Sequence, residues 1–228
     1  MKFEKTEVHG FTAAFRGMRN PLNSWHKSDS IVCREIDCKE CAYTDNCKIM
    51  KNGYCVPFVP GKNDLILAQR LIKAGSEHRK FMRQIMVWVD ITAPLFWWRQ
   101  FDTYKVGTTT NSTSTMHKLS TTPITKECFE HPELVWDCVI DMCEKQRQKY
   151  LETKDKKDWK KLIVCLPESW LQKRTVTMSY ENILNIVNHR KYHKLSEWSE
   201  DFINWAKSLP YSEELLFIEG DKKHEASF

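Results

Sequence analysis

The chain has 228 residues, 41% of them hydrophobic, and its 35 basic and 30 acidic side chains give a formal net charge of +5. This composition allows one domain with a substantial core, and the mild positive charge, spread along the chain, favours anionic ligands without a dedicated nucleic-acid footprint. The absence of an apolar run of about 18 residues excludes a transmembrane helix. No secretory signal is visible, so we expect a cytoplasmic protein whose nine cysteines are not paired in disulfides.

The N-terminal part predicts a strand, a helix and a cysteine-rich insertion. Residues 2–8 alternate weakly and predict a strand, residues 13–18 predict a short helix, and residues 20–24 predict a turn. Residues 31–58 differ in composition from both flanks. We therefore predict an insertion within a single domain of residues 1–228.

The insertion carries the spacing of a metal site at Cys33, Cys38, Cys41 and Cys47, with Cys55 as a spare ligand. A Cys-x-x-Cys turn directs two thiolates at one ion, and two more complete a tetrahedral set. Zinc is favoured, and an iron–sulfur cluster, which takes the same four thiolates, stays open. A second possible role for this segment is a nucleic-acid-binding module held together by a bound metal, although the acidic residues between the cysteines argue against it. The cysteines in predicted helices are expected to pack as small hydrophobic side chains: Cys128, Cys138, Cys143 and Cys165.

The central part predicts alternating elements. Asn63 and Asp64 are predicted to cap a helix that ends at Lys73, before Gly75. Residues 81–89 favour a strand but also permit a helix. Thr92 is predicted to cap a helix with Pro94 in its first turn, running to about residue 104. Residues 107–115 are rich in hydroxyl groups and predict a loop or the entry to a helix.

The C-terminal part is mostly helical. Helices are predicted at residues 132–153 and 156–165, a short strand at 176–178, a helix capped by Ser179, and a last helix at 196–209. The polar tail of residues 220–228 is expected to be loose. The predicted class is α+β, with a small mixed sheet and several long helices.

Several segments follow one family pattern in order along the chain: Glu77-His78 with Phe81, Arg99-Gln100, Leu166-Pro167, and Ser196-Glu197-Trp198. They resemble segments of the flavin-dependent thymidylate synthases, the ThyX-like family. Glu77-His78 with Phe81 resembles the family's E-H-x-x-F, and Arg99-Gln100 resembles its R-Q pair. Leu166-Pro167 followed by Thr177 to Glu181 resembles its L-P and T-x-N-x-R segments, and Ser196-Glu197-Trp198 resembles its A-Q-W-E stretch. The resemblance covers residues 62–210. It implies a ThyX-like fold, a homotetramer, and binding of FAD and dUMP.

The resemblance also assigns candidate site residues. It implies cofactor contacts from His78, Lys105, Thr108 and Asn185. It implies substrate contacts from Arg99, Gln100, Asn111, Thr113 and Arg190, with Gln100 and Thr113 in catalytic roles.

The family's arginine signature is largely replaced. Its R-H-R becomes Thr103-Tyr104-Lys105, the Arg that ends the signature becomes Thr115, and the Arg of N-x-R becomes Glu181. Guanidinium groups bind phosphate bidentately, and charge-assisted hydrogen bonds contribute roughly 1.5–3 kcal/mol each, so nucleotide affinity should be much reduced. Three functions remain open: a diverged flavin-dependent enzyme transferring a one-carbon unit or hydride to a pyrimidine nucleotide, a nucleotide-binding or regulatory protein without turnover, and the nucleic-acid-binding module.

Overall fold

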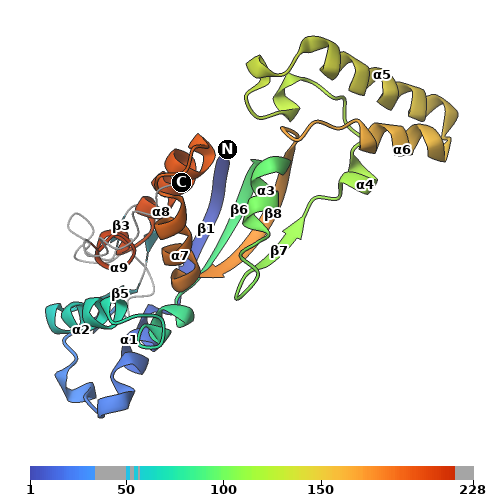
Figure 1. The fold of residues 1–228 in the computed structure, drawn as a ribbon. Helices are drawn as coiled ribbons and strands as arrows, with labels where there is room; N and C mark the ends of the chain where they lie inside the picture. The colour runs from blue at the N-terminus through green and yellow to red at the C-terminus, as the bar shows by residue number, and fades with distance from the viewer. Residues whose placement is uncertain (34–49, 52–53, 56, 219–228) are drawn as a thin grey trace. The chain divides into compact units, whose positions relative to one another are not determined.

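The computed structural model describes residues 1–33, 50–51, 54–55 and 57–218 (Figure 1). Its main sheet has the strand order β1-β6-β8-β7, formed by β1 (Lys2–His9), β6 (Met86–Pro94), β7 (Thr109–Ser112) and β8 (Leu171–Ser179). Two small antiparallel pairs join β2 (Ile31–Val32) to β5 (Phe58–Val59), and β3 (Met50–Lys51) to β4 (Tyr54–Cys55). The expectation of a small sheet with several helices is confirmed.

The helices occupy most of the remaining chain. The α-helices are α1 (Phe11–Met18), α2 (Lys62–Lys73), α3 (Leu95–Phe101), α4 (Thr115–Lys118), α5 (Asp137–Thr153), α6 (Lys156–Val164), α7 (Tyr180–Arg190), α8 (Ile203–Ser208) and α9 (Ser212–Leu215). Short 3-10 turns are η1 (Asn20–Leu22), η2 (Trp25–Lys27), η4 (Lys80–Gln84), η5 (Lys126–Cys128) and η6 (Pro132–Leu134), and a π-helical segment, η7 (Glu197–Phe202), precedes α8. Within the described ranges, no helix is both long and apolar enough to span a membrane.

The helix predicted from Thr92 was wrong at its start. Thr92 and Pro94 belong to β6, and α3 begins only at Leu95. The reason is the alternation of Val87, Val89, Ile91 and Ala93, all buried, with the more exposed residues between them. This period of two continues past Thr92, so burial of one strand face determines the structure there.

The prediction for the hydroxyl-rich segment holds only in part. Thr109–Ser112 forms the edge strand β7, where a loop was expected. The entry to a helix is confirmed, because the Ser114 side chain accepts a hydrogen bond from the amide of His117 at the start of α4. Backbone pairing at a sheet edge therefore outweighs the tendency of short polar side chains to form turns.

The predicted cap of α2 was also wrong. Gly61 is the N-cap residue, and Asn63 and Asp64 lie in the first turn. Their amide groups donate to the carboxylate of Asp29, at 2.8 and 3.1 Å. A side chain distant in sequence therefore satisfies the helix N-terminus. The stop before Gly75 is confirmed, since Gly75 adopts a φ of 111°.

Other boundaries shift by a few residues. The strand predicted at 176–178 extends over the whole of β8, and α5 begins at Asp137 after the separate turn η6. The segment from Ser196 is π-helical before α8, and it is not the last helix, because α9 follows. Ser179 caps α7 as predicted.

The chain divides into two compact units. Unit 1 comprises Met1–Lys5, Val89–Lys105 and Thr109–Val176; unit 2 comprises Thr6–Trp88, Val106–Thr108 and Thr177–Phe228.

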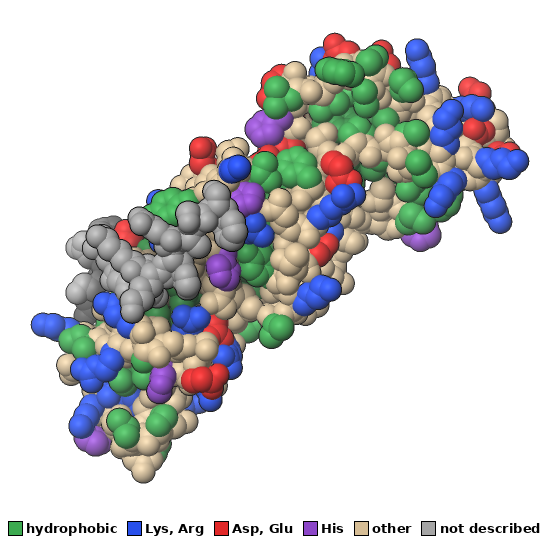
Figure 2. All heavy atoms as spheres, viewed as in Figure 1, with side chains coloured by type: hydrophobic (Ala, Val, Ile, Leu, Met, Phe, Trp, Pro, Cys, Tyr) green, Lys and Arg blue, Asp and Glu red, His purple; other side chains and the backbone are tan. Residues whose placement is uncertain are grey.

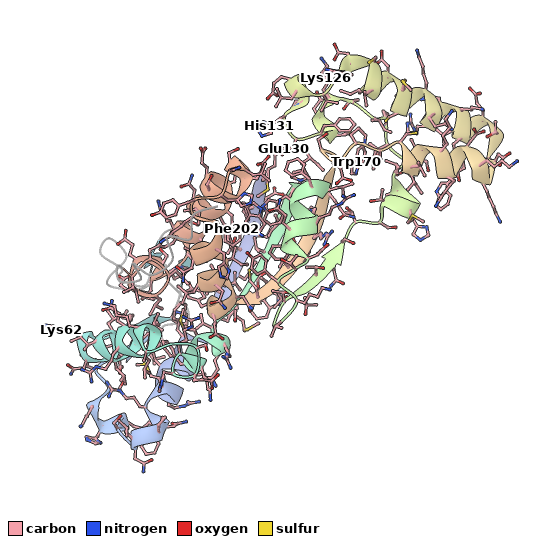
Figure 3. All side chains as sticks on the ribbon, in the orientation of Figure 1. Lys62, Lys126, Glu130, His131, Trp170 and Phe202 are labelled. Carbon is pink, nitrogen blue, oxygen red and sulfur yellow. The ribbon has the colours of Figure 1, made fainter. Side chains whose placement is uncertain are left out.

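Unit 1 has a tryptophan cluster and a second core beneath its helical hairpin. Trp97 stacks on Phe101 with ring centroids 5.1 Å apart, and the indole N–H of Trp98 donates to the carbonyl of Gln172 at 2.9 Å. Trp170, labelled in Figure 3, packs edge-on against Phe129 at 5.6 Å. The second core comprises Leu119, Ile124, Phe129, Ile140, Cys143 and Leu162.

Unit 2 is held by aromatic rings and one buried ion pair. Phe11 packs edge-on against Tyr180 and Tyr211, at 5.4 Å from each ring. The Tyr180 hydroxyl donates to the carbonyl of Pro210 at 2.7 Å. Arg19 Nε lies 2.6 Å from Asp64 Oδ1, and both side chains are almost completely buried. These rings are buried, and the tyrosine hydroxyl groups make hydrogen bonds, so the aromatic contacts hold the helices that pack around α7 in place.

The described residues of the cysteine-rich insertion include its two ends and the pair of strands β3 and β4. β2 and β5 pair Ile31 with Val59 and Val32 with Phe58, which brings the two ends of the insertion together. Cys33 is half-buried, whereas Cys38, Cys41 and Cys47 lie outside the described residues. The expectation for the helical cysteines holds for Cys143, which is buried, but not for the exposed Cys138 and Cys165, whose positions face away from the core.

Candidate functional site

The N-terminus of α7 is a fully formed capping box. The Ser179 hydroxyl oxygen accepts from the amide of Asn182 at 3.3 Å, and the Asn182 side-chain oxygen accepts from the amide of Ser179 at 3.0 Å. This reciprocal pair fixes the first turn of the helix, which carries Glu181. Ser179 and Glu181 stand where the resemblance places the family's Asn and Arg.

Asn182 also holds the short loop Val106–Thr108, which belongs to the same unit. Its side-chain amide donates to the carbonyl of Val106 at 2.7 Å. Gly107 has a φ of 75°, and a Cβ at this position would lie 3.1 Å from Asn182 Oδ1. Glycine is therefore favoured here by conformation, and an added Cβ would require the Asn182 side chain to shift by a few tenths of an ångström. Thr108, a predicted cofactor residue, is thereby held beside the start of α7.

Glu181 occupies the centre of an arginine network. Its carboxylate accepts from Arg79 Nε at 3.2 Å and from Arg83 Nε, with a longer contact to Arg83 Nη2 at 3.4 Å. Arg79 also donates through Nη2 to Asn185 Oδ1 at 2.8 Å. The hydrogen bond to Glu181 raises the pKa of Arg83.

This network retains one net positive charge from two guanidinium groups and one carboxylate. The Glu181 side chain is 9% exposed and that of Arg79 15%, whereas that of Arg83 is 48% exposed. Arg79 is therefore held by protein groups, and Arg83 is the guanidinium that solvent can reach. Because Asn185 Oδ1 accepts from Arg79, the amide NH2 is the group that Asn185 can offer to a ligand.

The sequence patterns did not predict Arg79 and Arg83 as partners of Glu181. The available signal was a charge reversal: an acidic residue at a family arginine position calls for a compensating cation. Arg79 directly follows His78, and Arg83 lies four residues later. His78 itself is exposed, and its amide donates to the carbonyl of Gly75 at 3.0 Å.

Arg190 lies at the other end of α7. Its guanidinium group is 4.9 Å from the centre of the Trp198 ring, a cation–π arrangement. His193 packs edge-on near the same ring, at 6.5 Å. Burial lowers the pKa of His193, and the charge of Arg190 lowers it further. Trp198 is thus the surface that orients Arg190.

The remaining predicted residues belong to unit 1. Arg99 and Gln100 lie on α3, where Arg99 pairs with Glu168 and its side chain is 74% exposed. Lys105 and Asn111 are exposed. The Thr113 amide donates to the carbonyl of Lys173 at 2.9 Å, and the Thr113 hydroxyl donates to the same oxygen at 3.2 Å. These bonds attach the end of β7 to β8.

The structure therefore brings together only some of the predicted residues. In unit 2, Asn185 shares a network with Arg79, the neighbour of His78, and Thr108 lies on a loop bonded to α7. A pocket of about 590 Å³ in the same unit, lined by Met18, Leu67, Arg70 and others, contains none of the residues predicted for the nucleotide or cofactor.

Two solved structures of flavin-dependent thymidylate synthase ThyX from Helicobacter pylori, each with FAD and dUMP, are similar to this chain. Both align with a TM-score of 0.67 and 14% sequence identity over 95% of this chain, covering 98% and 97% of the respective ThyX chains. The fold is ThyX-like. No protein-family model matches the chain, and no curated protein matches it. The likeness extends to the fold, as the sequence resemblance implied.

Proposed function

We propose that this chain binds a pyrimidine nucleotide of the dUMP class on its ThyX-like scaffold. The observation that carries the proposal is the network of Arg79, Arg83, Glu181 and Asn185 in the first turns of α7 and the segment before β6. It combines a net positive charge with the amide of Asn185, which the resemblance assigns to cofactor binding, and with Glu181, which stands at a family arginine position. The helix N-terminus adds a partial positive charge that favours an anion.

The proposed division of roles follows the family resemblance. Substrate contacts are assigned to Arg99, Gln100, Asn111, Thr113 and Arg190, and cofactor contacts to His78, Lys105, Thr108 and Asn185. Gln100 and Thr113 are the proposed catalytic pair for a flavin-dependent transfer. The similar ThyX structures are titled as complexes with FAD and dUMP, which supports testing both ligands.

The donor set fits a nucleotide monophosphate better than it fits FAD. A dinucleotide pyrophosphate favours several cations, whereas Lys105 is the single cation among the four proposed cofactor residues. Arg79 and Arg83 are already held by Glu181. We therefore derive no transfer step through FAD from these residues. A nucleotide-binding or regulatory protein without turnover is the second candidate, favoured by this commitment of both guanidinium groups.

The deciding experiment combines calorimetry and absorption spectroscopy on the purified full-length chain. We expect dUMP to bind and to raise the melting temperature, and deoxyuridine, which lacks the phosphate, to bind more weakly. Flavin absorption that copurifies with the protein, together with product formation from dUMP, would support the enzyme. A colourless protein that binds dUMP would support the second candidate. If dUMP binds neither to a flavin-containing protein nor to a colourless one, the proposal is wrong.

Arg190→Ala tests the proposed phosphate contact. We expect at least a tenfold loss of dUMP affinity with little change in deoxyuridine affinity, because the lost interaction is with the phosphate. Lys191→Ala, one residue further along, is the matched control. Equal affinities of wild type and Arg190→Ala for dUMP would remove Arg190 from the site.

The proposed homotetramer and metal centre have direct tests. Mass photometry measures the mass of the assembly, and elemental analysis of the purified protein distinguishes zinc from iron. A cytoplasmic location stays a prediction from the sequence.

A further inference from the structure

One basic segment of the chain lies at the tip of a helical hairpin. Residues 144–161 contain eight Lys or Arg and four Asp or Glu, a net charge of +4, whereas the whole chain has +5. The two helices as a whole, residues 137–164, carry +2, because Asp137 and Asp141 lie at their other end. Residues 70–83 also carry a net charge of +4, from five Lys or Arg and one Glu, so positive charge occurs in more than one segment, as expected.

The hairpin consists of α5 and α6, which lie side by side (Figure 1). Gln146 on α5 donates to the carbonyl of Asp158 on α6 at 3.0 Å, which joins the two helices. We call its exposed lysines the lysine surface: Lys145, Lys149, Lys154, Lys156, Lys157, Lys160 and Lys161. Figure 2 shows Lys and Arg side chains gathered over these helices.

Only part of this charge is neutralised within the hairpin. Arg147 is buried and pairs with Glu144 at 2.6 Å, and Lys149 pairs with Asp158 at 3.1 Å. Lys154 lies over the ring of Tyr150 at 5.7 Å. Among the described residues, no ion pair involves the five other lysines of the surface. Their ammonium groups extend into solvent.

The apolar side of the hairpin packs against the second core of unit 1. Ile140, Cys143 and Leu162 are buried in the second core of unit 1. The large exposed apolar side chains in and beside the hairpin, Leu134, Trp136, Met142 and Val164, stand at its base, away from the tip at Lys154 and Asp155. A helix that inserts into a membrane interface needs a continuous exposed apolar face, which this hairpin lacks. Its exposed face is suited to electrostatic contact with a polyanion.

We propose that the lysine surface binds the phosphate backbone of nucleic acid without reading its sequence. Lysine ammonium groups are compact charges on flexible stems, so they contact phosphates without the planar bidentate geometry that arginine uses to recognise guanine. Phosphate contacts of this kind position a protein on nucleic acid and carry no direct sequence information. The proposal is independent of dUMP binding, since no residue of the lysine surface belongs to the nucleotide site.

Fluorescence anisotropy with a labelled duplex DNA of arbitrary sequence tests this proposal. With about five phosphates contacted, affinity should fall by roughly 10²–10³ between about 50 and 200 mM salt. A variant with Lys156→Gln, Lys157→Gln, Lys160→Gln and Lys161→Gln should bind at least tenfold more weakly at low salt, with a flatter salt dependence. The corresponding Lys→Arg variant should retain binding.

The matched control removes the same charge elsewhere. Lys27, Lys62, Lys73 and Lys191 are exposed lysines of unit 2, and Lys62 is labelled in Figure 3. Their joint replacement by Gln should change DNA affinity less than threefold, with circular dichroism confirming that both variants fold. Equal weakening by both variants would show an effect of net charge alone and overturn the proposal. Absence of DNA binding, or binding only to vesicles containing anionic lipid, would also overturn it.

Discussion

Arg79 and Glu181 are 102 residues apart in sequence, yet Arg79 Nε lies 3.2 Å from Glu181 Oε1. Both side chains are largely buried, and Arg83 approaches the same carboxylate from the solvent side. Glu181, an acidic residue at a position where the sequence resemblance implies an arginine, is therefore neutralised from within unit 2. The contact closes the first turn of α7 and limits the positive charge available to a ligand.

Glu181→Gln should destabilise the protein by about 2 kcal/mol, because it leaves the guanidinium of Arg79 without its carboxylate in a largely buried position. Urea unfolding measures the change. Glu77→Gln is the control, since Glu77 forms an exposed pair with Lys80 at 3.4 Å and should contribute less than about 0.5 kcal/mol. Similar stability of the two variants would mean that the Glu181 network does not stabilise the fold.

Asp64→Asn should cost about 3 kcal/mol or more. Asp64 is 0% exposed, pairs with Arg19 at 2.6 Å, and also accepts a hydrogen bond from Ser28 at 2.6 Å. Removing the carboxylate leaves a buried guanidinium unpaired. A double-mutant cycle with Arg19→Met should show coupling, so that the double variant loses less stability than the two single losses combined. Additive losses would indicate that the two residues act separately.

Stability should decrease in acid through Glu144. Hydrogen bonds from Arg147 lower the pKa of Glu144 from its ordinary 4.5 to about 2, assisted by the amide of Ile124 and the side chain of Gln148. A depressed pKa stabilises the folded state above pH 4.5, and this contribution is lost as the pH falls toward 2. Wild type should therefore be more stable than Glu144→Gln at pH 7, and the difference should shrink steadily below pH 4.5. A difference independent of pH would contradict this pairing.

Gly107→Ala should destabilise the loop beside α7. A side chain there meets both a φ of 75° and the Asn182 oxygen at 3.1 Å, so we expect a loss of more than about 1 kcal/mol in thermal or urea unfolding. Gly75→Ala is a matched control: its φ is 111°, but no atom lies within 4 Å of the added Cβ. The Gly107 variant should be the less stable of the two. The reverse order would show that contact with Asn182 does not constrain the loop.

Local patterns in the sequence were sufficient for many elements of the fold. Ser179 was predicted to cap α7, and it does so through reciprocal hydrogen bonds with Asn182. Gly75 predicted the end of α2. By contrast, Thr92 and Pro94 resembled a helix start, and only the full alternation from Val87 to Ala93 shows that the strand continues.

Contacts between distant segments could not be read from local patterns. The cap of α2 comes from Asp29, more than thirty residues upstream, and the partners of Glu181 come from the turn before β6. Individual residues of the candidate site were chosen by resemblance, and their environments depend on such distant contacts. Thr113, for example, directs its hydroxyl toward the carbonyl of Lys173, which the composition of its own segment does not indicate.

The most direct test of the nucleotide site is calorimetric titration of dUMP into wild type, Glu181→Gln and Glu77→Gln. Removing the Glu181 charge frees two guanidinium groups and eliminates repulsion of a phosphate, so dUMP affinity should rise about tenfold, a gain of about 1.4 kcal/mol. Glu77→Gln should match wild type. If a folded Glu181→Gln protein binds dUMP no more tightly than wild type, the arginine network is not part of a nucleotide site. That result would contradict the proposal that dUMP binds beside Arg79 and Arg83.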